Sequence, residues 1–108
     1  MKLSTKRILF STTLARLVLY LNILGYGVAI DYVKRCKDCK IGHKNSVHKS
    51  GLAADLNIYD DHGLYLSDKH PDTFVIHSLA HTWWDENGGA KRIKNDLNHY
   101  SFKYKGMR

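Results

Sequence analysis

The chain has 108 residues, of which 44% are hydrophobic and 25% charged, with a single proline. These values are typical of one globular domain, here 1–108, and they argue against a disordered chain. The formal net charge of +7 indicates a polyanionic partner, for which nucleic acid, a membrane surface and a bacterial cell wall all qualify. A solvated basic surface is the alternative explanation, because lysine and arginine are spread along the chain.

The N-terminal part combines a basic start with a largely apolar stretch at 8–30. Such a stretch fits a signal peptide or membrane anchor, but Arg16 and Asn22 interrupt it and favour an amphipathic helix packed on a core. We expect Gly25 or Gly27 to end this helix. Apolar residues at three- and four-residue steps predict its buried stripe: Phe10, Leu14, Leu17, Val18, Leu21 and Leu24.

Two strands and a hairpin are predicted next. A short strand is expected at 26–33, and the alternation at 52–59 predicts a second strand with Ala54, Leu56 and Ile58 on its core side. Turn residues at 60–63 predict a hairpin that returns through 64–66.

The last third predicts a helix and a strand. Pro71 can open a helix over about 72–86 whose buried stripe is Val75, Leu79 and Trp83, and alternation predicts a strand at 99–104. The order of elements therefore predicts an α+β fold: a small, mostly antiparallel sheet with an N-terminal amphipathic helix and a second helix.

Four residues form the candidate site. His48 and Asp55 stand with six residues between them, and Asp96 and His99 follow near the C-terminus. His48, Asp55 and His99 supply two nitrogen ligands and one oxygen ligand, the set with which a catalytic zinc ion keeps one position open for water. Asp96 is then free to carry a proton. We expect this zinc site on the open face of the sheet.

The two cysteines allow a different hypothesis. Cys36 and Cys39 form a C-x-x-C pair, and His43 and His48 follow at distances that can complete a zinc knuckle in a small basic nucleic-acid-binding protein. A pair of reduced thiols or a small disulfide is the alternative.

The residues of the first hypothesis also carry a family resemblance. Ser46-x-His48-x-x-Gly51-x-Ala53-x-Asp55 followed by Asp96-x-x-His99 resembles the zinc-dependent D-alanyl-D-alanine carboxypeptidases and L-alanyl-D-glutamate endopeptidases, especially small phage endolysins. The resemblance extends over most of the chain.

The resemblance implies His48, Asp55 and His99 as zinc ligands, Asp96 as catalytic acid and base, and Arg35 as a residue that polarises the scissile carbonyl or holds a substrate carboxylate. It implies hydrolysis of a stem-peptide bond of bacterial peptidoglycan by a monomer that binds no nucleic acid and does not insert stably in a membrane. The protein would stay in the host cytoplasm before release to the wall, or be secreted or periplasmic if its N-terminal segment is a signal peptide.

Two further expectations concern this resemblance. The segment 87–93 departs from the tryptophan-glycine-glycine pattern of many relatives, which bears on the shape of the substrate groove. The remaining histidines match no motif and are expected on the surface or on a helix face: His43, His62, His70, His77 and His81.

Overall fold

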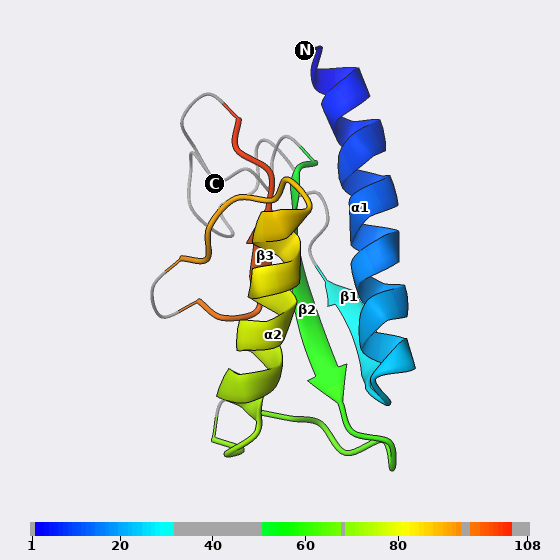
Figure 1. Cartoon of the computed structure of the whole chain (residues 1–108), viewed down its shortest axis with the longest axis vertical. Coiled ribbons are helices and arrows are strands. Elements are labelled where there is room, and N and C mark those ends of the chain that lie inside the picture. Colours follow the sequence, from blue (N-terminus) through cyan, green and yellow to red (C-terminus); the bar gives the residue numbers. More distant parts are fainter. Residues whose placement is uncertain (1, 32–50, 68, 94–95, 105–108) are drawn as a thin grey trace.

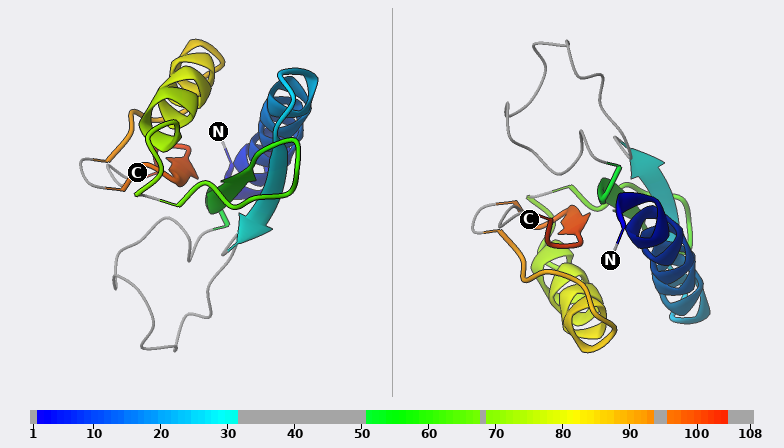
Figure 2. Two further views of the ribbon diagram at one scale, coloured as in Figure 1. Left: turned by 90° about the horizontal axis from the view of Figure 1, so that it is seen from below. Right: turned by 90° about the horizontal axis from the view of Figure 1, so that it is seen from above.

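The computed structural model describes residues 2–31, 51–67, 69–93 and 96–104. Within these residues the chain forms two helices and a three-stranded antiparallel sheet, ordered β1-β2-β3. The two helices run antiparallel and lie on the same side of the sheet (Figures 1 and 2). The predicted α+β class is therefore confirmed.

Helix α1 covers Leu3–Ile23 and packs one stripe on the core. It ends as predicted at Gly25, whose φ of 100° suits glycine. The N–H groups of Gly25 and Tyr26 close the helix by donating to the carbonyls of Asn22 and Leu21, both at 3.0 Å, which is a Schellman cap. The stripe differs from the prediction at its edges, since Leu24 is exposed and Thr13 is buried. Thr13 tolerates burial because its hydroxyl donates to the Leu9 carbonyl.

None of the helices in the described part of the chain is long and apolar enough to cross a membrane.

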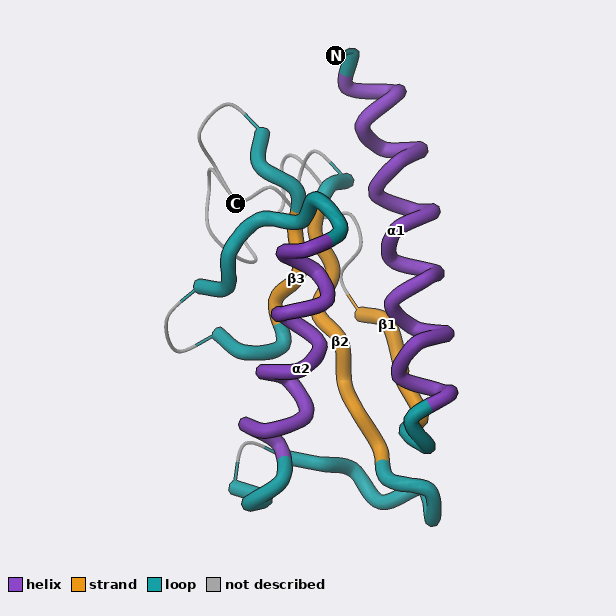
Figure 3. The backbone as a smooth tube through the Cα atoms, viewed as in Figure 1, coloured by secondary structure: helices purple, strands orange, loops and turns teal. Residues whose placement is uncertain are grey.

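The sheet is built around β2, Ala53–Tyr59, which pairs with β1, Gly27–Asp31, on one edge and with β3, His99–Ser101, on the other. The predicted alternation of β2 is confirmed: Leu56 and Ile58 are buried beneath the helices, whereas Asp55 and Asn57 are partly exposed. The hairpin return is also present, as a bridge between Tyr59 and Tyr65 (Figure 3).

Helix α2 covers Thr73–Glu86 and follows Pro71 as expected. Its buried stripe was predicted wrongly, because Val75 and Leu79 are 55% and 46% exposed. The face that packs on the sheet is rotated by one residue and consists of Thr73, Ile76, His77, Ala80, His81 and Trp84. Two imidazoles thus occupy positions that the periodicity of apolar residues assigned to solvent.

Aromatic rings join the two helices to the end of the sheet. Phe10 of α1 packs edge-on against Trp84 of α2 and Phe102, with ring centroids 5.8 and 5.4 Å apart. The indole N–H of Trp84 donates to the Ser101 carbonyl at 2.8 Å. Gly89 lies flat against this indole, because a Cβ at Gly89 would come within 2.0 Å of the ring.

Candidate functional site

Two of the three predicted metal ligands are neighbours across the sheet. Asp55 of β2 stands opposite His99 of β3 in the register, and Asp55 Oδ1 lies 3.6 Å from His99 Nδ1. The His99 side chain is almost enclosed, with 6% of its surface exposed, and the Asp55 side chain has 17% exposed. Cross-strand pairing of two alternating strands is what brings them together.

Asp96 stands on the tight turn that leads into β3. Its carbonyl accepts the N–H of His99 at 3.3 Å, and its own N–H donates to the Ile93 carbonyl at 3.1 Å. The turn is fixed to the sheet because Leu56 N–H donates to the Asn98 carbonyl at 2.8 Å. The three-residue spacing therefore places Asp96 and His99 at the two ends of one hydrogen-bonded turn.

The other predicted site residues lie outside the described residues. These are His48 and Arg35 of the peptidase hypothesis, and Cys36, Cys39 and His43 of the zinc-knuckle hypothesis. Among the residues that the structure does describe, no three His, Cys, Asp or Glu side chains are grouped closely enough to hold a metal ion.

Asp55 and His99 are placed as two ligands of one zinc ion would be. Two ligands held at about 2.1 Å from one ion in tetrahedral geometry are about 3.4 Å apart, and the observed separation of Asp55 Oδ1 and His99 Nδ1 is 3.6 Å. An imidazole nitrogen and a carboxylate oxygen are also the ligand types that zinc prefers. Asp55 and His99 would therefore hold the ion, with His48 as the remaining ligand implied by the sequence.

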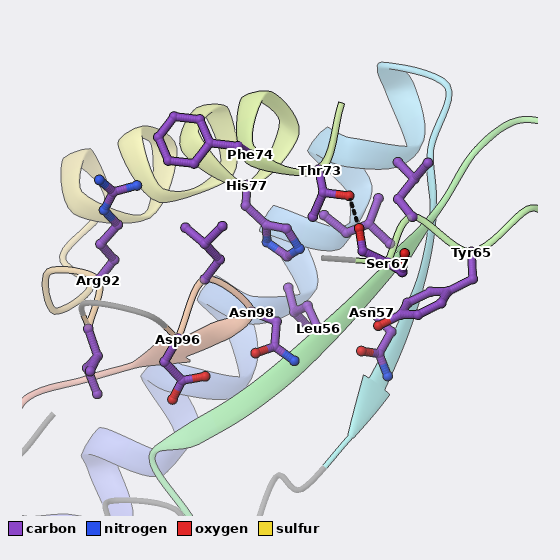
Figure 4. Close-up of a pocket in the computed structure, with 14 residues that line it drawn as sticks. Leu56, Asn57, Tyr65, Ser67, Thr73, Phe74, His77, Arg92, Asp96 and Asn98 are labelled. Carbon is purple, nitrogen blue, oxygen red and sulfur yellow. Dashed lines mark hydrogen bonds between the residues drawn. The ribbon is translucent and has the colours of Figure 1, made fainter. Parts of the chain in front are cut away.

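A groove of about 860 Å³ opens beside this turn, between β2, the start of α2, residues 92–93 and residues 96–98. Figure 4 shows Asp96 at its lower side and His77 pointing into it from α2. Its described walls are mainly apolar and include the basic side chain of Arg92, whose guanidinium lies 5.3 Å from the ring centroid of Phe74. A volume of this size holds a small ligand or a short peptide segment.

Two histidines of α2 that support the site were not among the residues predicted for it. Both were expected on the surface or on a helix face; they lie on the buried face of α2, where His77 and His81 are only 3% and 4% exposed. His81 Nε2 donates to the Leu97 carbonyl at 2.6 Å, within the turn that carries Asp96. The one available signal was their spacing, because histidines four residues apart, with Ala80 and Trp84 on the same side, define one helix face.

Tyr100 of β3 links the two histidines. Its hydroxyl lies 2.7 Å from His77 Nδ1, and its ring stacks on His81 with centroids 4.1 Å apart and an interplanar angle of 11°. Burial, together with the neighbouring His81, lowers the pKa of His77 to about 4. Burial also lowers the pKa of His81 and raises the pKa of Tyr100. All three groups are therefore neutral near pH 7.

Comparisons of the chain with protein-family models, with curated proteins and with solved structures found no match.

Proposed function

We propose that this protein is a zinc-dependent peptidase that hydrolyses an amide bond in the stem peptide of bacterial peptidoglycan. The observation that carries the proposal is the Asp55–His99 pair, whose separation of 3.6 Å suits two ligands of one ion, next to a turn that presents Asp96. The spacing of these residues with His48 and the family resemblance of that pattern supply the substrate class.

The chemistry divides between the ion and the chain. Zinc, when bound, supplies a water of lowered pKa and polarises the scissile carbonyl. Asp55 and His99 hold the ion, and the nearly complete burial of His99 strengthens its electrostatic interactions. Asp96 accepts a proton from the attacking water and gives it to the leaving amine. The groove beside Asp96 offers a surface for the peptide chain.

The net charge of +7 also suits this substrate. Peptidoglycan and its associated polymers carry carboxylates and phosphates, so a basic surface raises the rate of encounter with the wall. Among the described residues of the groove, Arg92 is a basic side chain that an acidic stem peptide would meet.

Hydrolysis of purified peptidoglycan by the full chain, followed by mass spectrometry of the released fragments, tests the proposal. We expect stem-peptide fragments that disappear with a chelator and return with added zinc. Asp96→Asn should reduce the rate by at least about a hundredfold, as expected for loss of a general acid and base, without loss of bound zinc. Asp61→Asn, which changes an exposed carboxylate of the turn after β2, is the matched control and should leave the rate unchanged.

Metal content distinguishes this proposal from the zinc-knuckle hypothesis. Under our proposal His99→Ala lowers the zinc bound per chain, and Cys36→Ser leaves it unchanged. Zinc loss in Cys36→Ser combined with full retention in His99→Ala would contradict the peptidase and support the knuckle.

A further inference from the structure

Arg92 lies on the wall of the groove with no acidic partner in the described part of the chain. The ion pairs found there do not include its guanidinium, although the side chain lines the same groove as Asp96. Arginine keeps its charge throughout the pH range of folded proteins, and all its polar hydrogens are donors. Arg92 therefore offers the groove a permanent positive charge that no described carboxylate pairs with.

Phe74 holds this guanidinium in place. The Arg92 guanidinium lies over the Phe74 ring, 5.3 Å from its centroid, and Phe74 is 57% exposed at the start of α2. The attraction between a cation and an aromatic face uses no hydrogen bond, so the N–H groups of Arg92 stay available to an anion. Since both residues are exposed, a ligand in the groove can reach them without displacing the buried core.

Asp96 and Arg92 stand at two separate points of the groove. Ile93 and Asp96 form an isolated antiparallel bridge, which joins the backbone next to Arg92 to the turn that carries Asp96. Figure 4 shows the Arg92 side chain directed toward Phe74 and away from the Asp96 carboxylate. The two charges therefore do not pair with each other. Asp96 stays available for proton transfer, and Arg92 for a negative charge on the ligand.

A peptidoglycan stem peptide carries the groups that such an arginine binds. Its D-glutamyl residue is linked through the γ-carboxyl and keeps a free α-carboxylate, and its C-terminal D-alanine carries another carboxylate. A planar guanidinium matches a carboxylate with two parallel hydrogen bonds, which fix orientation as well as position. One such contact, made at a distance from Asp96, is enough to orient a peptide along the groove.

We propose that Arg92, positioned by Phe74, binds a free carboxylate of the stem peptide and thereby determines which peptides the groove accepts. This inference rests on the proposed function and specifies the feature of the substrate that the site recognises. The contact anchors the peptide at Arg92 and leaves its scissile bond to lie beside Asp96. Conversion of the bound carboxylate into a carboxamide removes the charge and so weakens the anchor.

Three peptides test the inference on the zinc-loaded chain. The parent is L-alanyl-γ-D-glutamyl-L-lysyl-D-alanyl-D-alanine, and in the two derivatives either the glutamyl α-carboxylate or the C-terminal carboxylate is a carboxamide. One of the derivatives should have a kcat/KM at least about tenfold lower than the parent, the value of one charge-assisted hydrogen bond. The affected derivative identifies the carboxylate that Arg92 binds. Equal cleavage of all three peptides would overturn the inference.

Variants assign this carboxylate preference to Arg92. In Arg92→Gln the parent and the affected derivative should be cleaved with kcat/KM values within about twofold of each other, because the group that distinguishes them is gone. Phe74→Leu should lower the preference to about threefold, since the guanidinium loses the ring that positions it. Lys91→Gln removes the same charge from an exposed neighbour outside the groove and, as the matched control, should retain the full preference. Equal losses in Arg92→Gln and Lys91→Gln would overturn the inference.

Binding gives a readout that does not depend on turnover. Isothermal titration calorimetry of the zinc-loaded Asp96→Asn chain should give a Kd about tenfold lower for the parent than for the affected derivative, and the addition of Arg92→Gln should abolish this difference. A difference that persists in the double variant would overturn the inference and leave the proposed function intact. Failure of the wild-type chain to cleave peptidoglycan and all three peptides would instead refute the proposed function.

Discussion

The two helices are attached to the same sheet by different kinds of contact. The buried face of α1 is almost entirely apolar, with Phe10, Leu14, Leu17 and Leu21 at most 5% exposed. The buried face of α2 also carries polar and aromatic side chains, and three of them, His77, His81 and Trp84, are hydrogen-bonded to β3 and to the turn before it. Apolar burial is not directional, whereas hydrogen bonds fix position and orientation.

The two kinds of contact have different consequences, one for the stability of the fold and the other for the geometry of the site. We infer that α1 contributes mainly free energy of folding, and that α2 holds in place the segment that carries Asp96 and His99. Changes in α1 should therefore lower stability and leave the activity of the folded protein unaltered, whereas changes in the α2 contacts should affect both. The following predictions test this division.

The largest expected effect is on the α1 side. Leu17 is 0% exposed in the centre of the core, and Leu17→Ala should lower the free energy of unfolding by about 4 kcal/mol, because it removes buried methyl groups and leaves a cavity. Urea denaturation measures this loss. At a temperature where the variant is folded, its kcat/KM should equal that of the wild type. A tenfold lower kcat/KM in the folded variant would contradict the division. Exposed Leu19 provides the control, since Leu19→Ala should change stability by less than about 0.5 kcal/mol.

The second effect concerns Gly89 at the end of α2. A Cβ at this position would approach the Trp84 indole to 2.0 Å, so Gly89→Ala must displace the ring and weaken its 2.8 Å hydrogen bond to Ser101. We expect a loss of about 3 kcal/mol and, in contrast to Leu17→Ala, a lower kcat in the folded fraction because β3 shifts. Thermal unfolding measures the loss of stability, and tryptophan fluorescence reports the displacement of the Trp84 ring. Unchanged fluorescence and stability would show that the indole has room to move.

The third effect is a dependence of stability on pH that originates on the α2 side. The pKa of His77 falls from 6.5 to about 4 on folding, so the unfolded chain binds the additional proton when the pH lies between these values. Stability contributed by neutral His77 is therefore complete above pH 6.5 and is lost as the pH falls toward 4. The loss at pH 4.5 should be about 2.5 kcal/mol relative to pH 7.

Urea denaturation at pH 7, 5.5 and 4.5 measures this dependence. The titratable groups packed against His77 are His81 and Tyr100, and both remain in His77→Gln. The difference between the two pH profiles therefore isolates His77. Parallel profiles would mean that His77 titrates normally in the folded protein.

The same contrast explains what the sequence could predict. The elements of the fold follow from local patterns: the apolar stripe of α1, the alternation of β2 and the glycine that ends α1 were all recognisable. The buried stripe of α2 was not, because histidine is counted as polar. It becomes a core residue here where Tyr100 bonds one nitrogen of His77 and the Leu97 carbonyl accepts from one nitrogen of His81. Those partners lie some twenty residues away in the chain.

The candidate site, too, could be predicted only in part from the sequence. Alternation placed Asp55 on the partly exposed side of β2, and its register with His99 is consistent with the shared site predicted from spacing. The groove was not predictable, because its walls come from β2, the start of α2 and the turn before β3, which lie far apart in the chain. The predicted strand ran from 99 to 104, but β3 ends at Ser101. The Ser101 carbonyl accepts both Ala90 N–H and the Trp84 indole N–H there.

The smallest effect on stability is the most informative about the site. His81→Phe keeps the stack on Tyr100 but removes the 2.6 Å hydrogen bond to the Leu97 carbonyl. We expect a loss of only about 1 kcal/mol in stability, together with a roughly tenfold lower kcat, because a catalytic group displaced by a fraction of an ångström loses rate steeply. His81→Gln, which restores a donor, should recover most of the rate. Equal kcat in wild type and His81→Phe would show that the turn keeps Asp96 in position without α2, and the functional contrast between the two helices would then fail.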